Sequence, residues 1–196
     1  MTNNLFKHAI ALTGGIATGK STVSNLLKLH GFSIIDADAI AHKLLDKHSA
    51  QIALMFGQDF VENGKVLRKR LAKIIFSDEK EKLKLEAFIH PLIKDEIYKE
   101  AKVFEKQEKT YFIDIPLFFE KMHYPIPKSL VIYIPKDIQI QRLMQRDGIN
   151  EEEAKLKMSN QMDIEEKKDL ADFVIDNSSS LQNLQNEVEK TIKEIL

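Results

Sequence analysis

The sequence contains no cysteine at any of its 196 positions. Disulfides, thiolate nucleophiles and thiolate-bound metal sites are therefore excluded from its chemistry. The absence also fits a reducing compartment, where disulfides are rare.

An excess of one charge and a long apolar run are missing as well. The 29 Lys and Arg residues are balanced by 30 Asp and Glu residues, for a formal net charge of −1. This balance gives no sign of general binding to nucleic acids or membrane surfaces. The first apolar run, residues 9–12, is too short to cross a membrane, and no signal-peptide pattern surrounds it. We expect a cytoplasmic protein, with a monomer favoured.

Internal repeats and low-complexity linkers are absent too. Hydrophobic residues make up 43% of the chain, which is typical of a globular protein. This length and composition predict one compact domain, with small insertions at most.

Five short apolar runs predict buried strands. They are continuous rather than alternating, as expected when helices cover both faces of a sheet. Helical patterns lie between them, and strands that alternate with helices indicate an α/β fold with a parallel sheet. The predicted strands are residues 9–12, 32–35, 111–115, 130–134 and 173–175.

Two regions depart from this alternation. Residues 58–101 lack a convincing strand and are predicted to be helical, with a break or kink near His90 because Pro91 follows it. Residues 150–170 are rich in Glu and Lys and have few apolar residues to anchor them. We expect this second region to move.

The most informative motif is GGIATGKS at residues 14–21, which matches G-x-x-x-x-G-K-[ST]. A predicted strand precedes it and an amphipathic helix follows, so a chance glycine-rich turn is a poor alternative. Glycines let the backbone approach phosphate oxygens closely, and successive N–H groups at a helix N-terminus attract anions. We expect Lys20 to reach the β- and γ-phosphates of ATP and the Ser21 hydroxyl to ligate Mg²⁺.

Asp36 and Asp38 follow the second predicted strand, where ligands bind in open α/β sheets. One carboxylate near the γ-phosphate is suited to accept a proton from an acceptor hydroxyl or to help hold Mg²⁺. Since Asp is also favoured as a helix N-cap, one of the two can serve only as a cap. If a helix starts here, the two side chains diverge.

Asp114 ends the third predicted strand, where either a Walker-B-like carboxylate or a simple turn residue would fit. The segment that follows, residues 116–120, is mostly apolar and is explained by packing. Arg142 and Arg146 share one face of a predicted helix and are suited to bind phosphate oxygens, although a solvated face is equally compatible.

Two further candidates have weaker support. The basic run at residues 68–70, which begins with Arg68, is suited to bind acceptor phosphates, but a solvated charge run is the more ordinary interpretation. His90 is able to hydrogen-bond an acceptor, yet a lone His in an apolar helix is more often structural.

Together these segments resemble the dephospho-CoA kinases. The match spans nearly the whole chain in the right order, and its parts are specific only in combination. The matching segments are residues 12–16, 36–38, Arg68 with Leu71 and Phe76, Leu85-Glu86 with His90-Pro91, residues 116–120, Arg142-Leu143 with Arg146-Asp147, Gln161, Ala171-Asp172 and residues 174–177.

The resemblance implies ATP-dependent phosphorylation of the ribose 3′-hydroxyl of dephospho-CoA, the last step of coenzyme A synthesis. It also implies a P-loop kinase fold with a five-stranded parallel sheet flanked by helices. The core would comprise residues 1–57, 102–149 and 171–196, with a helical acceptor-binding insert at 58–101 and a helical lid at 150–170. ATP and dephospho-CoA would be its partners, with no nucleic acid and no membrane.

The resemblance also assigns roles to individual residues. Asp38 is the expected general base, acting with Lys20 and Arg142 as catalytic residues. Asp36, Asp38, Arg68 and His90 are expected to bind the acceptor, and Ser21 the metal. The expected ATP-binding residues are Gly14, Gly15, Ile16, Ala17, Thr18, Gly19, Lys20, Ser21, Thr22, Arg146 and, near the adenine, Asn177.

The sequence departs from the family's usual pattern at a few positions. Ala17-Thr18 stand where Gly-Ser is usual, and we expect position 17 to need only right-handed helical or extended geometry, which alanine adopts freely. Lys157 and Lys167 stand where many relatives have Arg, and Lys lacks the bidentate fork of Arg.

Other functions remain to be compared with this one. A nucleoside-monophosphate kinase of the same architecture would recognise a base and a 5′-phosphate. A GTP-dependent switch usually carries an Asn-Lys-x-Asp motif, which the sequence does not contain. A non-catalytic ATP-binding scaffold would require Asp38 to be idle.

Overall fold

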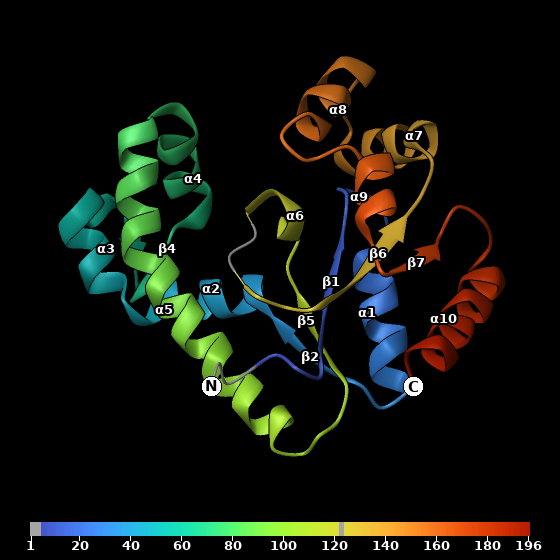
Figure 1. Cartoon of the computed structure of the whole chain (residues 1–196). Coiled ribbons are helices and arrows are strands. Elements are labelled where there is room, and N and C mark those ends of the chain that lie inside the picture. The colour runs from blue at the N-terminus through green and yellow to red at the C-terminus, as the bar shows by residue number, and fades with distance from the viewer. Residues whose placement is uncertain (1–4, 122–123) are drawn as a thin grey trace. The chain divides into compact units, whose positions relative to one another are not determined.

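The computed structural model describes residues 5–121 and 124–196 (Figure 1). Residues 1–4 and 122–123, which the sequence analysis assigns to the core, lie outside the described residues. The chain divides into two compact units. The first consists of Met1–Ile35 and Phe104–Leu196, and the second of Asp36–Val103.

A five-stranded sheet forms the centre of the first unit, with strand order β2-β5-β1-β6-β7. β1 pairs in parallel with β5 and β6, and β6 pairs in parallel with β7. All five predicted strands are confirmed, with ends that differ by one or two residues. The strands are β1 (Ala9–Gly14), β2 (Ser33–Asp36), β5 (Tyr111–Asp114), β6 (Lys128–Tyr133) and β7 (Phe173–Asp176).

The strand register brings the carboxyl ends of the strands together. Leu12 of β1 lies opposite Asp114 of β5, and Gly14 lies opposite Ile132 of β6. Tyr133 lies opposite Asp176 of β7. The connections that leave β1, β5 and β7 therefore start from one edge of the sheet, which is where ligands bind in this class of fold.

Helices α1 (Lys20–Leu29) and α10 (Leu181–Ile195) pack together on the sheet, side by side in Figure 1. Their apolar faces bury Val23, Leu27 and Val188 in one core with residues of the central strands. Gly31, which has a φ of 87°, follows the end of α1, a common place for glycine. This core holds the start of α1 against the end of β1.

A smaller core includes the first residue of α9 (Ile164–Leu170). Ile164 packs with Val131 and Tyr133 of β6. The hydroxyl of Tyr133 donates a 2.7 Å hydrogen bond to the Glu165 carboxylate, which together with burial raises the pKa of Tyr133 to about 12. The Lys168 ammonium lies 4.2 Å from the centre of the Tyr133 ring. α9 is thus anchored more firmly than its Glu- and Lys-rich sequence suggested.

The remaining helices of the first unit are shorter or more exposed. α7 ends at Gly148, whose φ of 64° suits a glycine C-cap. Asn150 and Glu153 form a capping box that starts α8. These helices are α6 (Phe118–Lys121), α7 (Lys136–Asp147) and α8 (Glu151–Met158).

The second unit is mostly helical, but it contains a β-hairpin that the sequence analysis missed. β3 (Val61–Glu62) pairs antiparallel with β4 (Lys65–Val66). Asn63 and Gly64 join them with φ values of 49° and 74°. The prediction that residues 58–101 lack a strand is therefore wrong, although Asn-Gly is a strong signal for a two-residue hairpin turn.

Helix α5 (Glu79–Glu105) runs without a break through Pro91. Of the predicted break or kink near His90, the break is therefore wrong, and the kink stays a prediction. A proline inside a helix costs about 3 kcal/mol, whereas burying one large apolar side chain gives about 1.5–3 kcal/mol. Leu85, Ile89 and Ile97 are buried on both sides of the proline, so packing outweighs its cost. The other elements of this unit are α2 (Ala37–Lys47), α3 (Ser49–Phe56), η1 (Gln58–Phe60) and α4 (Arg68–Ser77).

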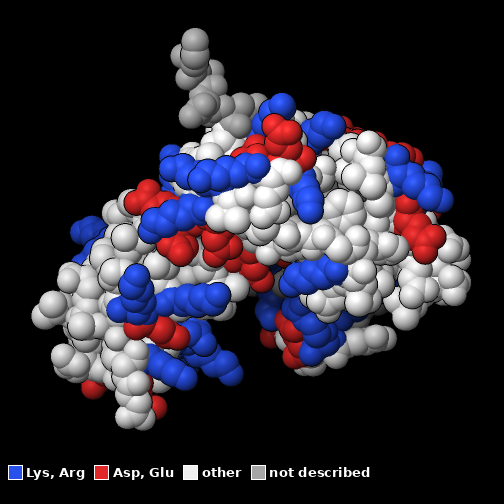
Figure 2. Space-filling view, turned by 90° about the horizontal axis from the view of Figure 1, so that it is seen from below, with Lys and Arg blue, Asp and Glu red and all other residues white. Residues whose placement is uncertain are grey.

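Charges of both signs are intermixed on the molecular surface, as the face in Figure 2 shows. This mixture agrees with the formal net charge of −1. Among the described residues, no helix combines the length and the apolar character needed to cross a membrane.

Candidate active site

The motif at residues 14–21 forms the turn between β1 and α1, as the sequence predicted. Gly19 caps α1 with a φ of 87° and offers no side chain to the first helical N–H groups. Within the described chain, the N–H groups of Ala17, Gly19, Lys20 and Ser21 donate no hydrogen bond to another protein group. They are therefore available to an anion, and the positive end of the α1 dipole favours one.

Ala17 adopts a φ of 63°, in the left-handed region. The expectation that position 17 needs only right-handed helical or extended geometry is therefore wrong. A left-handed conformation costs a residue with a Cβ roughly 1–2 kcal/mol, which glycine avoids. The alanine found where the family usually has glycine thus places strain inside the loop.

Lys20 forms an ion pair with Asp114, which ends β5. The Lys20 side chain is one-fifth exposed, and the Asp114 side chain is mostly buried. The structure therefore brings the loop lysine and the candidate Walker-B-like carboxylate together. A simple turn residue at position 114 would not need this buried contact with the loop.

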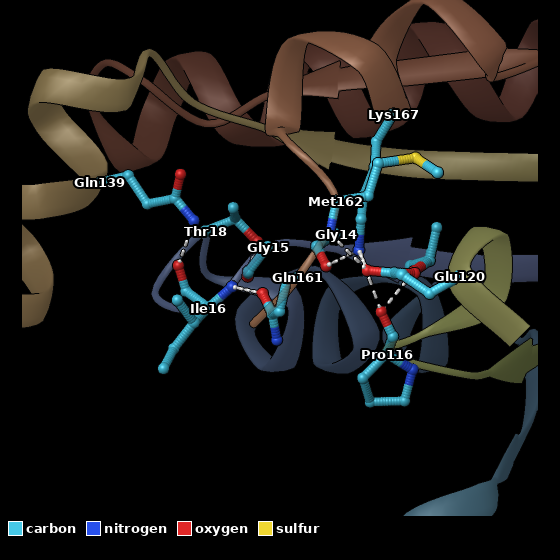
Figure 3. A network of polar contacts seen from close by, with 11 residues as sticks. Gly14, Gly15, Ile16, Thr18, Pro116, Glu120, Gln139, Gln161, Met162 and Lys167 are labelled. Carbon is cyan, nitrogen blue, oxygen red and sulfur yellow. Dashed lines mark hydrogen bonds and ion pairs between the residues drawn. The ribbon is translucent and has the colours of Figure 1, made fainter. Parts of the chain in front are cut away.

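Three polar side chains beside the loop were given no role from the sequence: Gln139, Glu120, which lies in a segment explained by packing, and Lys167, noted only as a departure from the family's Arg. Lys167 is fully buried, and its ammonium lies 2.8 Å from Glu120 Oε1. It also donates to the carbonyls of Gly14 and Pro116, each at 3.2 Å (Figure 3). Removing one partner of such a buried pair typically costs about 3–5 kcal/mol. The interpretation of residues 116–120 as apolar packing alone is therefore incomplete.

Ile16 is held at both of its backbone polar groups (Figure 3). Its N–H donates to Gln161 Oε1 at 2.8 Å, and its carbonyl accepts from Gln139 Nε2 at 2.7 Å. Gln161 precedes Met162, whose N–H donates to Glu120 Oε1 at 3.0 Å. The connection between α8 and α9 is therefore fastened to the loop. The only signal for Gln139 is its position, four residues before the buried Leu143 on α7.

Arg142 and Asn177 meet beside the same loop. The Arg142 guanidinium donates to the Asn177 carbonyl at 3.0 Å, and Asn177 Nδ2 donates to the Thr18 carbonyl at 2.8 Å. Arg142 is half-buried, so the interpretation of its face as merely solvated does not hold for this residue.

Arg146 points to a different partner. It forms two hydrogen bonds with Asp147, at 2.8 and 3.3 Å. Lys157 of α8 also contacts Asp147, at 2.6 Å. The hydrogen bonds from Arg146 and Lys157 hold the pKa of Asp147 well below its usual range. In this arrangement Asp147 links the end of α7 to α8.

Asp36 and Asp38 take different roles, because α2 begins at Ala37. Asp36 caps the helix by accepting a 2.8 Å hydrogen bond from the Ala39 N–H. Asp38 lies in the first helical turn and is exposed. Its carboxylate accepts no hydrogen bond from any residue that the structure describes, so it is available to a ligand.

The candidate acceptor residues Arg68 and His90 belong to the second unit. Arg68 forms a 3.2 Å ion pair with Asp46, which also accepts the Val66 N–H at 2.9 Å. Arg68 is about half exposed, so Asp46 orients it without covering it. His90 is half-buried in the middle of α5.

No cluster of three His, Asp or Glu side chains suited to a metal lies within residues 5–121 and 124–196. The expected Mg²⁺ site therefore has Ser21 as its candidate protein ligand. Ser21 is exposed in the first turn of α1, and its hydroxyl has no hydrogen-bond partner in the described chain. A hydroxyl beside a phosphate site fits Mg²⁺, which takes few protein ligands and completes its shell with phosphate oxygens and water.

Comparison with known proteins identifies the family. The dephospho-CoA kinase family model matches residues 8–183. The chain is 47% identical over 195 residues to the dephospho-CoA kinase of Helicobacter pylori, covering 98% of this chain and 100% of the relative. It is 49% identical over 190 residues to that of Sulfurimonas denitrificans, covering 97% and 95%.

A solved structure agrees with these matches. The dephospho-CoA kinase of Campylobacter jejuni superposes with a TM-score of 0.78 at 39% identity, over 96% of each chain. Its fold and length therefore correspond to those of the present chain. On the family match and these relatives, the chain belongs to the dephospho-CoA kinase family.

Proposed function

We propose that this chain transfers the γ-phosphoryl group of ATP to the ribose 3′-hydroxyl of dephospho-CoA, giving coenzyme A and ADP. Family membership over nearly the whole length supports the choice of substrates. The observation that carries the proposal is the turn between β1 and α1. Beside Lys20 it presents N–H groups that have no acceptor among the residues the structure describes. Such a turn binds the phosphates of a nucleotide.

The loop and its lysine hold the triphosphate. The N–H groups of Ala17, Gly19, Lys20 and Ser21 contact its oxygens, with Thr22 in the same helical turn. Lys20 exchanges part of its contact with Asp114 for the β- and γ-phosphate oxygens. Charge builds up on these oxygens in the transition state, and a fixed ammonium stabilises it.

Two arginines of α7 add positive charge on the same side of the reaction. Arg142 is already fixed by the Asn177 carbonyl, so it approaches the phosphates with little loss of side-chain freedom. Arg146 is exposed and turns from Asp147 toward the nucleotide. The resemblance placed Asn177 near the adenine, whereas its amide here donates to the Thr18 carbonyl of the loop.

Asp38 acts as the general base. It takes the proton of the 3′-hydroxyl as the bond to phosphorus forms, and its exposure without a protein partner supports this role. Asp36, Arg68 and His90 contribute to acceptor binding, with Arg68 held ready by Asp46. Residues 58–101 form the acceptor-binding insert.

Ser21 is the protein ligand of Mg²⁺. When bound, the ion would neutralise part of the negative charge of the phosphate oxygens. The free, exposed hydroxyl of Ser21 supports this assignment.

Residues 150–170 form the lid that keeps water from the transferred group. Its second helix, α9, is anchored by Lys167, so α8 supplies the mobile part.

We infer a monomer in the cytoplasm, which light scattering and cell fractionation would test. The absence of cysteine agrees with a reducing compartment.

An acceptor panel tests the proposed function. ATP consumption is measured with Mg²⁺ and dephospho-CoA, and in parallel with AMP, CMP, shikimate and no acceptor. We expect rapid turnover with dephospho-CoA alone, and the Lys20→Ala variant should be inactive but folded. Preferential phosphorylation of AMP or CMP would replace this function with that of a nucleoside-monophosphate kinase.

A further inference from the structure

Three carbonyls of the phosphate loop, those of Gly14, Ile16 and Thr18, accept hydrogen bonds from side chains outside the loop. Lys167 Nζ contacts the Gly14 carbonyl at 3.2 Å, and Gln139 Nε2 contacts the Ile16 carbonyl at 2.7 Å. Asn177 Nδ2 contacts the Thr18 carbonyl at 2.8 Å. These donors come from α9, α7 and the segment after β7, so three separate elements converge on one short turn.

This pattern fixes the direction of the loop's N–H groups. The carbonyl of one residue and the N–H of the next share a rigid peptide plane and point in opposite directions. Holding the carbonyls of Ile16 and Thr18 toward the protein therefore turns the N–H groups of Ala17 and Gly19 away from it. Neither N–H has an acceptor in the part of the chain that the structure describes. A peptide that flipped would present a carbonyl oxygen to the phosphates and repel them.

The donor side chains are buried rather than exposed to ligand. Lys167 is fully buried, while Gln139 and Asn177 are 3% and 9% exposed. Among the described residues, Gln139 Oε1 has no hydrogen-bond partner, and the amide's one hydrogen bond there is from Nε2 to the loop. The charge of Lys167 is balanced by Glu120 at 2.8 Å.

Two glycines of the motif lie directly against these donor side chains. A Cβ at Gly15 would lie 2.4 Å from Gln139 Nε2. A Cβ at Gly19 would lie 2.2 Å from Asn177 Nδ2. A side chain at either position would therefore displace the donor behind the loop, and Gly19 also has a φ of 87°, which favours glycine.

We propose that Gln139, Lys167 and Asn177 form a carbonyl clamp, a set of positioning residues that aims the loop's N–H groups at the phosphates of the nucleotide. The clamp rests on the phosphate-binding part of the proposed function and not on the identity of the acceptor. It assigns Asn177 to the loop rather than to the adenine.

The test compares neutral variants that cannot donate a hydrogen bond. Gln139→Met and Asn177→Leu keep the side-chain size approximately and remove the amide donor. Gln141→Met and Asn186→Leu are matched controls, because both residues are exposed, on α7 and α10, and make no hydrogen bond through their side chains in the described chain. Binding of Mg·ADP and of inorganic tripolyphosphate is measured by calorimetry, beside the melting temperature without ligand.

The clamp predicts that each donor-lacking variant binds both ligands about tenfold more weakly, the equivalent of about one hydrogen bond, while the controls bind normally. Tripolyphosphate has no adenine, so a loss for Mg·ADP alone in Asn177→Leu would return that residue to the adenine site. Unchanged tripolyphosphate affinity in Gln139→Met, or a lower melting temperature with normal affinities, would overturn the clamp. Gln139 and Asn177 lie on different elements, so if one variant fails to fold, the affinities of the other still test the clamp.

These outcomes are separate from those of the acceptor panel. Neither ligand contains the acceptor, so the binding result stands whichever hydroxyl is phosphorylated. A wild-type chain that failed to bind Mg·ADP at all would instead contradict the proposed function itself.

Discussion

At the scale of single residues, Asp36 and Asp38 show how two neighbouring carboxylates divide their roles. Asp36 caps α2, whereas Asp38 is exposed and accepts no hydrogen bond within the described chain. The helix that starts between them makes their side chains diverge, as the sequence analysis expected if a helix began there.

This division predicts different effects of the same substitution. Asp38→Asn should lower turnover of dephospho-CoA by roughly 10²–10⁴-fold, the usual contribution of a general base. Asp36→Asn is the matched control, because Asn caps helices as well as Asp does, so it should keep the fold and most of the turnover. Steady-state kinetics of both variants provides the measurement. A greater loss in Asp36→Asn would reverse the assignment of the base.

Ala17 allows a stability prediction. Its φ of 63° is left-handed, so Ala17→Gly should raise the free energy of unfolding by up to about 1 kcal/mol. Ala87→Gly, at an exposed site inside α5, should lower it by about 1 kcal/mol. Urea unfolding without nucleotide measures both. A loss of stability in both variants would show that the alanine in the loop is unstrained.

The sequence predicted the loop residues better than their surroundings. Residues 14–21 form a local motif whose chemistry follows from its residue types. Gln139 and Glu120 act through contacts with residues distant in sequence, which no local pattern reveals. Lys167 was noted only as a departure from the family's Arg, with no partner assigned. A buried, fully paired lysine has the same letter as the solvated lysines around it, and only tertiary structure distinguishes them.

At the scale of elements, the junction of α7 and α8 depends on Asp147. Arg146 and Lys157 hold the pKa of this carboxylate below its usual range. Because the pKa of Asp147 is lower in the folded state than in the unfolded state, its contacts contribute fully to the free energy of unfolding above the unfolded pKa. This contribution is lost only as the pH falls through the folded pKa. The junction should therefore stay intact at moderately acidic pH.

An NMR titration of the Asp147 carboxyl carbon tests this junction. Its midpoint should lie below that of an unperturbed aspartate, about 3.9. Lys157→Met should raise the midpoint, because it removes one of the two cations. Lys155→Met is the matched control on the same helix, since Lys155 pairs with Glu151 instead. An equal shift in both variants would mean that general charge, rather than this contact, sets the pKa.

Two elements of the second unit show where sequence patterns misled. The strands of the β3–β4 hairpin are two residues each, too short for an apolar run, and only Asn63-Gly64 reveals them. Pro91 suggested a break, but apolar side chains are buried before and after it on the same helix. In both cases contacts within the unit outweighed the signal that the sequence analysis used.

At the scale of the whole molecule, the first unit was predictable in its main features. All five strands were found because a sheet covered on both faces needs continuous apolar runs, and parallel pairing followed from the helices between them. The family resemblance, read from scattered short segments, is confirmed by matches over nearly the full length.

The central claim is that the chain phosphorylates the 3′-hydroxyl of dephospho-CoA. The most direct measurement is to incubate it with Mg·ATP and dephospho-CoA and to identify the product by mass and by phosphorus NMR. We predict one added phosphate on the ribose 3′-oxygen for each ADP formed. ADP release without a gain in acceptor mass, or a phosphate at any other position, would contradict the account.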